Sequence, residues 1–378
     1  MRRFWQFLFL IPLALLMSGC SGSSGGGGGV NVKLVDAPTR DYQEINVHIL
    51  AVDIHTSSGW VTLGSPDLTV NLLSLTGGLT QTLVSGASLP EGQYEQMRLL
   101  LGTGNTVRLS DGSLQELKVP SGLQTGIKLP LSFTVAAGTT KDIFIDFDGA
   151  HSVQVTHAGG SGQYLLRPTV RAYDQVVTGS ISGTLTDSGS AAALGGATVL
   201  AETLDGGVPT LVRSTLTDTA GAYVLDLLPV GATYYVVSMP RVGSPVQAYD
   251  PLASGGMALS PSSPLFTYSA AFTASSAVGA IAGGITPVVA SDQSDIVWLR
   301  RLLAVPSAST QLFIVDSAMA TVDSSSESYG FTSLPLGDYS LLGVRTTWLS
   351  GGDSSTADSG AVDATVTADT TTTADLVF

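Results

Sequence analysis

Two aspartates that stand two positions apart, Asp146 and Asp148, are the first residues that could do chemistry. They lie in the segment KDIFIDFDGAHS, where Ile143, Ile145 and Phe147 alternate with other side chains as in a β-strand with one buried face. On such a strand the two carboxylates share a face about 7 Å apart and could flank a hard cation such as calcium. Calcium takes roughly six to eight oxygen ligands, however, and an EF-hand spacing is absent. Asp146 and Asp148 are therefore weak calcium candidates, and the alternative is a solvated strand face that ends in an Asp-Gly turn.

The four histidines provide no hydrolytic motif. They are His48, His55, His151 and His157. None belongs to an HExxH pair of the kind that binds zinc in metalloproteases. His151 and Ser152 lie directly after the aspartate pair, but a serine triad is recognised by geometry, and Ser152 is not part of a GxSxG nucleophile elbow. A hydrolase acting on surface polymers ranks last, and we expect no catalytic residue and no cofactor.

The only cysteine of the chain, Cys20, stands between an apolar run and a glycine string. The segment MRRFWQFLFLIPLALLMSGC begins with two arginines and continues with an uncharged stretch of 14 residues, 4–17. This stretch is shorter than the roughly 20 residues that span a bilayer and is typical of a secretory signal peptide. Its Ser-Gly-Cys ending resembles a bacterial lipobox, although Met17 occupies a position where Leu or Val is commoner. The resemblance implies that Cys20 is lipidated, and the alternative is an ordinary signal peptide with an incidental cysteine.

The composition excludes nucleic acid as a partner and predicts an all-β protein. The chain of 378 residues carries 16 basic and 30 acidic residues, a formal net charge of -14, whereas phosphate binding requires clustered Lys and Arg. Only 12% of the residues are charged, while 44% are hydrophobic and 44 are Gly. Abundant Val, Leu, Thr, Gly and Ser indicate β-strands joined by many turns.

The region from residue 30 onward has the pattern of a β-sandwich or barrel, with turn signals about every 8 to 12 residues. The segment INVHILAVDIHTSSGWVTL predicts a hairpin that turns at SSG. VKLVDAP, GWVTL, LPEGQYEQMRLLL, IFIDFD and YLLRPTVRA, in this order, resemble domain-of-unknown-function family 4382. That family is similar to secreted and lipid-anchored bacterial proteins. The resemblance implies an extracytoplasmic β domain at residues 30–176, without an established activity.

The rest of the chain contains a repeat. GSISGTLTD at 179–187 is echoed by GAIAGGITP at 279–287, and TDTAGAYVLDLLPVGATYYVV at 217–237 by SSSESYGFTSLPLGDYSLLGV at 324–344. The echo predicts two copies of one domain, 178–277 and 278–378. Both resemble the carboxypeptidase regulatory-like domain, a small prealbumin-like sandwich with a carbohydrate-binding-like fold. In the second copy, helical spacing of apolar residues after Ser294 predicts a short surface helix within SDQSDIVWLRRLLAVPS.

Carbohydrate binding is the function that this fold resemblance implies, and it requires exposed aromatic platforms. Three tryptophans follow the signal peptide. Trp348, beside a glycine loop, is the candidate platform. Trp60 follows a hairpin turn and is predicted to lie in the core, and Trp298 is predicted to pack the short helix against its sandwich.

Together these patterns predict a lipid-anchored string of tandem antiparallel β-sandwich domains in the bacterial cell envelope. A signal peptide (1–19) precedes the lipidated cysteine and a flexible Gly/Ser tether (20–29). Ser21 favours the outer membrane if the cell has two membranes. We expect a binding or scaffold protein that contacts the membrane through its anchor, with polysaccharide or envelope proteins as ligands. The alternative is a purely structural spacer that presents the amino-terminal domain to a protein partner.

Overall fold

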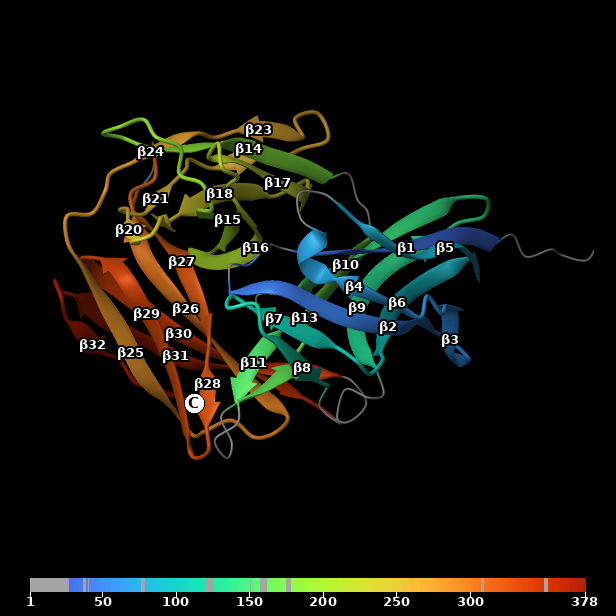
Figure 1. Cartoon of the computed structure of the whole chain (residues 1–378). Coiled ribbons are helices and arrows are strands. Elements are labelled where there is room, and N and C mark those ends of the chain that lie inside the picture. The colour runs from blue at the N-terminus through green and yellow to red at the C-terminus, as the bar shows by residue number, and fades with distance from the viewer. Residues whose placement is uncertain are drawn as a thin grey trace, which may run out of the picture.

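A computed structural model describes residues 27–36, 39, 41–75, 79–119, 126–149, 151–156, 162–174, 178–306, 309–349 and 353–378. Within these residues the chain forms 33 β-strands and one short 3-10 helix, which confirms the all-β prediction (Figure 1). None of the helical structure in this part of the chain is long and apolar enough to cross a bilayer. Cys20 and the predicted signal peptide lie outside the described residues.

The first domain is built from two sheets that share one apolar core. One sheet has the order β13 (Thr169–Asp174), β10 (Thr140–Asp148), β1 (Gly27–Val35), β5 (Gln81–Pro90). The other contains β9 (Ile127–Val135), β6 (Gly92–Leu101), β2 (Tyr42–Thr56), β7 (Thr106–Leu109), β8 (Leu114–Lys118), β12 (Gln163–Leu166) and β11 (Val153–Thr156). Beside β2 lie β3 (Gly59–Gly64) and β4 (Leu68–Asn71), and the 3-10 helix Leu72–Ser74 follows β4.

The predicted alternation of buried and other side chains along the strand around residue 145 is confirmed. Ile143, Ile145 and Phe147 of β10 are fully buried, as the period of two requires. The predicted hairpin is also present, with β2 and β3 joined where Thr56 pairs with Gly59. Trp60 is a correction, because it is only half-buried on β3, where the Arg98 guanidinium lies 4.5 Å from its ring centroid.

The glycine tether ends earlier than the sequence predicts. Gly27, Gly28 and Gly29 are the first residues of β1; all three pair with β5, and Gly29 also pairs with β10. A Cβ on Gly28 would lie only 2.6 Å from the backbone oxygen of Ala136. These glycines are needed because the backbones approach closely, a reason that a composition-based prediction of flexibility does not consider.

The second and third domains are each two small sheets. One sheet of the second domain contains β14 (Thr178–Asp187), β17 (Ala222–Pro229), β23 (Leu265–Thr267) and β24 (Ala270–Phe272). The other contains β16 (Val208–Leu216), β15 (Thr198–Asp205), β18 (Thr233–Ser238), β21 (Leu252–Ala253) and β22 (Met257–Ala258). A separate hairpin is formed by β19 (Arg241–Val242) and β20 (Gln247–Ala248). One sheet of the third domain contains β25 (Val278–Thr286), β29 (Ser326–Pro335), β28 (Thr321–Asp323), β32 (Thr371–Thr373) and β33 (Leu376–Val377). Its other sheet contains β27 (Gln311–Met319), β26 (Gln293–Leu303), β30 (Gly337–Trp348) and β31 (Ser354–Val366).

These two domains have the same strand pairing. β14 runs antiparallel to β17 and parallel to β23 and β24, and β25 runs antiparallel to β29 and parallel to β32 and β33. A Cβ on Gly183 would lie 1.7 Å from the backbone oxygen of Tyr268, and one on Gly283 would lie 1.7 Å from that of Ala374. Only glycine permits this close strand approach, so the repeated Gly of the two echoed motifs has a structural cause.

The short surface helix predicted after Ser294 is wrong. Residues Gln293–Leu303 form β26, a strand between β27 and β30. Ile296, Val297 and Leu299 are all buried, so both faces of the strand are covered. A strand buried on both faces loses the polar alternation that identifies strands, and its apolar positions then imitate a helical period.

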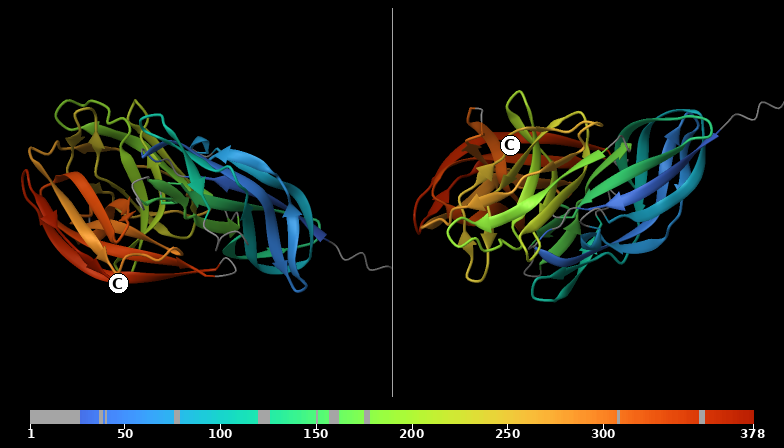
Figure 2. Two further views of the ribbon diagram at one scale, coloured as in Figure 1. Left: turned by 60° about the horizontal axis from the view of Figure 1, so that its bottom comes forward. Right: turned by 90° about the horizontal axis from the view of Figure 1, so that it is seen from above.

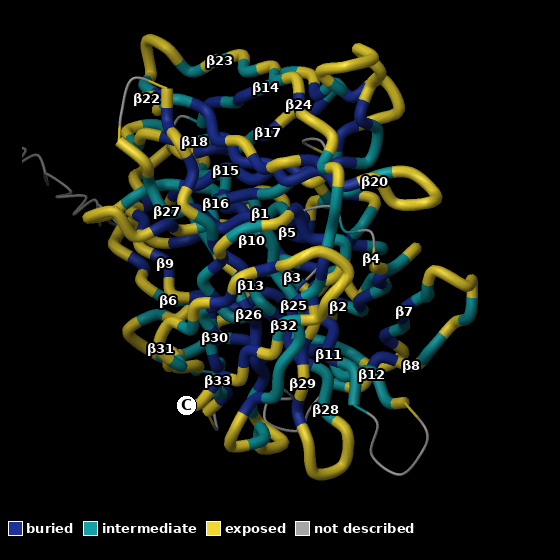
Figure 3. The backbone as a smooth tube through the Cα atoms, turned by 90° about the vertical axis from the view of Figure 1, so that its left-hand side faces the viewer, coloured by how far each residue is buried: buried dark blue, intermediate teal, exposed yellow. Residues whose placement is uncertain are grey.

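The three domains are not a string, because the third domain returns to the first (Figures 1 and 2). β28 pairs with β11 of the first domain, so one sheet continues across both domains. Trp348, the predicted exposed platform, is 5% exposed and packs in the first domain's core. The Arg167 guanidinium covers it, 5.2 Å from the ring centroid. Buried segments lie mostly in the interior of the molecule, and exposed residues gather at its outer turns (Figure 3).

Replacing Trp348 with alanine should remove this contact between domains. We expect the free energy of unfolding to fall by about 3–5 kcal/mol, because a large buried aromatic leaves a cavity. Urea unfolding of residues 27–378 measures the loss. The matched control, Trp60→Ala, removes a half-buried ring and should cost about 1 kcal/mol. Equal losses in the two variants would show that Trp348 does not hold the domains together.

Candidate functional site at the domain junction

The three domains enclose a cleft of about 500 Å³, here called the junction cleft. The first domain contributes Asp41 and His151, the second domain contributes Arg241, and the third contributes Asp316 and Ser317. A cleft walled by three separate domains combines side chains that no single β-sandwich could bring together. It is the cavity among the described residues to which all three domains contribute polar side chains.

The face of β10 that carries Asp146 and Asp148 points away from the first domain's core and toward the second domain. It is largely covered, because β16 of the second domain lies over it, and only part of the Asp148 side chain, 29%, stays exposed. This corrects the solvated face predicted as the alternative for Asp146 and Asp148. The Arg213 guanidinium of β16 lies 3.6 Å from Asp146 and donates a hydrogen bond of 3.1 Å to the Tyr173 hydroxyl. Burial raises the pKa of Asp146 above its usual range, although Arg213 opposes this. Asp146 therefore works as an interdomain ion-pair partner.

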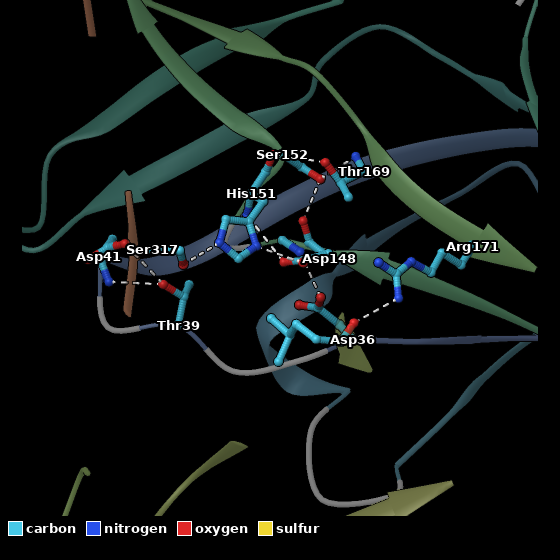
Figure 4. Close-up of polar contacts among 11 residues, drawn as sticks. Asp36, Thr39, Asp41, Asp148, His151, Ser152, Thr169, Arg171 and Ser317 are labelled. Carbon is cyan, nitrogen blue, oxygen red and sulfur yellow. Dashed lines mark hydrogen bonds and ion pairs between the residues drawn. The ribbon is translucent and has the colours of Figure 1, made fainter. Parts of the chain in front are cut away.

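Asp148 belongs to a chain of polar contacts that ends on the third domain (Figure 4). Its Oδ2 lies 2.7 Å from Nδ1 of His151, and Nε2 of His151 lies 2.7 Å from Oγ of Ser317. Ser317 lies on β27, 166 residues further along the chain. The structure therefore aligns a carboxylate, an imidazole and a hydroxyl across a domain boundary.

The loop that carries His151 is held on all sides (Figure 4). Asp36 accepts a hydrogen bond of 2.8 Å from the Gly149 N–H. The Ser152 hydroxyl donates to the Asp148 carbonyl at 2.5 Å and accepts from the Thr169 N–H at 2.9 Å. Ser152, the serine that stood beside His151 in the sequence, is thus fully used in bracing the loop. The imidazole is fixed toward Ser317 instead.

Burial and charge set the protonation of this pair. Burial alone would raise the pKa of Asp148, but the charge and hydrogen bonds of His151 outweigh it and hold that pKa below its ordinary value. Burial alone would likewise lower the pKa of His151, but Asp148 outweighs it and raises that pKa. Each group therefore stabilises the ionised form of the other.

The metal candidates, the other histidines within the described residues and Trp298 all contact other protein side chains. No three His, Cys, Asp or Glu side chains gather at a metal-binding distance in the part of the chain described, and Asp146 and Asp148 each face a basic partner. His48 contacts Asp67 at 2.9 Å, and His55 packs on the Trp60 ring. His157 lies outside the described residues. Trp298, on β26 rather than on a helix, packs against His151 with ring centroids 5.2 Å apart.

The contact between the second and third domains uses residues that carried no sequence signal. Glu202 of β15 is fully buried and accepts a hydrogen bond of 3.0 Å from the Ile314 N–H of β27. Its Oε1 has no hydrogen-bond partner among the described residues. Burial raises the pKa of Glu202 to about 8. Arg241 completes the contact by pairing with Asp316 and by donating to the Thr332 carbonyl at 2.9 Å.

Two family models match the chain. Residues 27–168 match the Domain of unknown function (DUF4382), and residues 180–255 match the Carboxypeptidase regulatory-like domain. These matches confirm the resemblance of the amino-terminal domain and of the first copy of the repeat, in the expected order, whereas the second copy, 278–378, lies outside both matched ranges. A search of curated proteins finds no match.

Comparison with solved structures gives distant likenesses. The Bacillus anthracis TIE protein is 11% identical with a TM-score of 0.21, and the alignment covers 93% of this chain and 51% of that one, about half its length. The Streptococcal ancillary pilin is 12% identical with a TM-score of 0.22, covering 92% of this chain and 98% of that one. The shaft pilin SpaA from Lactobacillus rhamnosus GG is 11% identical with a TM-score of 0.19, covering 65% and 97%. TM-scores this low assign neither a fold nor a function.

The substitution Glu202→Gln should change how stability depends on pH. The folded protein holds a proton on Glu202 up to about pH 8, whereas the pKa in the unfolded chain is 4.5. Its contribution is therefore complete below pH 4.5 and is lost as the pH rises toward 8, by on the order of 4 kcal/mol. Urea unfolding from pH 4.5 to 9 should show this decline in the wild type and a flatter profile in Glu202→Gln.

The control for this series is Glu116→Gln, which alters an exposed carboxyl on β8. It should keep the wild-type pH profile. Parallel profiles for wild type and Glu202→Gln would mean that Glu202 ionises in the folded protein as it does in the unfolded chain.

Proposed function

We propose that this chain is a lipid-anchored extracytoplasmic scaffold whose three β domains form one rigid body, and that the junction cleft binds an envelope polysaccharide. The docking of Trp348 in the first domain's core is the observation that carries this proposal. Without it, the cleft would have no fixed walls. A preformed cleft binds with a smaller entropic cost than one that must be assembled on binding.

The position of the amino-terminal strand supports the anchored arrangement. β1 begins at the end of the first domain that lies farthest from the other two domains (Figures 1 and 2). A lipid on Cys20, seven residues before Gly27, would hold that end at the membrane. The second and third domains would then point away from the membrane, with the cleft between them and the first domain. The net charge of -14 would also discourage contact with anionic headgroups.

The lining of the cleft suits a sugar better than an apolar ligand. Asp41, Ser333 and Thr332 supply carboxylate and hydroxyl groups for hydrogen bonds to sugar hydroxyls. Val246 and Leu216 add aliphatic surface against which the C–H face of a sugar ring can pack. This cleft takes the place of the Trp348 platform, which is buried.

The anchor is tested with Cys20→Ser in the full chain, expressed in a bacterial host that makes lipoproteins. The wild type should incorporate labelled palmitate and fractionate with membranes, because acyl chains on one cysteine hold a protein at a bilayer. Cys20→Ser should incorporate none and should leave the membrane fraction. Unchanged membrane fractionation of the variant would contradict anchoring through this residue.

The ligand class is tested by calorimetric titration of residues 27–378 with a panel of bacterial and plant polysaccharides. We expect saturable binding to at least one of them. Asp41→Ala, which removes an exposed carboxylate from the cleft wall, should weaken that binding about tenfold, the effect of one lost hydrogen bond to a charged group.

The matched control is Asp323→Ala, which removes an exposed carboxylate of β28 outside the cleft. It should bind like the wild type. If no polysaccharide of the panel gives heat and saturation, the polysaccharide part of the proposal fails. The lipid anchor is then still tested independently by Cys20→Ser.

A further inference from the structure

The polar chain at the wall of the junction cleft has the arrangement of a serine nucleophile and its base. We propose that Ser317, His151 and Asp148 form an acyl-transfer site that cleaves small carboxylic esters in the junction cleft. This activity goes beyond the scaffold role and does not depend on it. The inference rests on geometry, because the two linking distances are both 2.7 Å.

The hydrogen bonds define which nitrogen of His151 can act as a base. Asp148 is an acceptor when ionised, so Nδ1 of His151 donates to it and carries the proton in the neutral ring. Nε2 is then an acceptor and can take the hydroxyl proton of Ser317. Asp148 also accepts a hydrogen bond of 3.2 Å from the backbone N–H of His151, which fixes the carboxylate. Asp148 is thus a positioning residue for the imidazole.

The base is held rigidly and is largely shielded from water. His151 is 7% exposed, and the Trp298 ring packs against it. The bracing of its loop by Asp36 and Thr169 leaves the ring little freedom to turn away from Ser317. Catalytic groups need this kind of pre-organisation, and an ordinary surface histidine does not have it.

Ser317 is accessible from the side on which a substrate would enter. Its residue is half-buried and lines the junction cleft, whose volume of about 500 Å³ is sufficient for a small ester. Arg241 and Asp316, which form an ion pair, line the same cleft.

The reaction balances with an ester and water as the only reactants. The Ser317 Oγ forms a bond to the acyl carbon while its proton moves to Nε2 of His151, and the ester C–O bond breaks. His151 returns that proton to the departing alcohol. Water then attacks the acyl-serine with His151 again as the base, which releases the carboxylic acid and restores the serine hydroxyl.

The rate should depend on the neutral form of His151. The charged groups that act on the imidazole are Asp148 of β10, Asp41, and Asp316 of β27, all acidic. Arg171 and Arg213 line a small cavity that His151 also lines. The carboxylates raise the pKa of His151 above 6.5. Turnover should therefore increase with pH through a single ionisation above 6.5 and then level off.

The test uses residues 27–378, a fluorophosphonate probe that modifies activated serines, and p-nitrophenyl acetate as the ester. We expect the probe on Ser317 by peptide mass spectrometry, and ester turnover reduced at least 100-fold in Ser317→Ala. His151→Ala should lose the label. Asp148→Asn should slow labelling and alter its pH dependence while Ser317 is still present.

The matched control is Ser214→Ala, which removes another half-buried serine of the junction cleft. It should keep labelling and turnover within twofold of the wild type. Thermal unfolding of each variant separates lost chemistry from lost folding. A folded wild type without label on Ser317, or with label that persists in folded His151→Ala, would overturn the proposal.

Discussion

The contact between Arg167 and Trp348 is the constraint on which the other interdomain contacts depend. Arg167 is 2% exposed, donates to Gln154 at 3.1 Å and to the Ser291 carbonyl, and covers the indole ring. Burial lowers the pKa of Arg167 to about 10, so it stays charged at neutral pH. A buried cation is costly unless it is paired or hydrogen-bonded, and here the third domain supplies one acceptor and the aromatic face. The two domains therefore supply the contacts of this charge together, through its Nε and Nη2, while its Nη1 has no hydrogen-bond partner among the described residues.

The polar groups of the junction follow from that docking. Asp146 meets Arg213, His151 meets Ser317, and Arg241 meets Asp316, in each case across a boundary between two domains. Apolar contacts alone would allow domains to slide past one another. Buried hydrogen bonds and ion pairs instead have narrow geometric requirements, so we attribute the fixed orientation of the three domains to them. The junction cleft keeps its shape for the same reason.

Much of the local structure could be predicted from the sequence, because it depends on neighbours along the chain. The alternation of Ile143, Ile145 and Phe147 identifies the buried face of β10. The turns before Tyr234 and Tyr339 depend on nearby residues too. Each Tyr hydroxyl donates back to a proline carbonyl of the preceding turn, that of Pro229 at 2.7 Å and that of Pro335 at 2.8 Å.

What could not be predicted depends on contacts between distant segments. β26 is covered on both faces, so its sequence carries no period of two. A glycine loop beside Trp348 indicates exposure, but the third domain returns and buries it. The partner of His151 is 166 residues away, and no spacing rule connects them. The candidate site is thus a product of domain docking, which only the three-dimensional arrangement shows.

The central claim, that three domains form one rigid body, is tested most directly by measuring distances between them. The single native cysteine precedes residue 27, so residues 27–378 accept engineered labels without interference. Spin labels at Ser58 in the first domain and Ser325 in the third, both exposed turn residues, report the relation by double electron–electron resonance. The account predicts one narrow distance distribution, unchanged by dilution. A broad distribution from independently moving domains would contradict it.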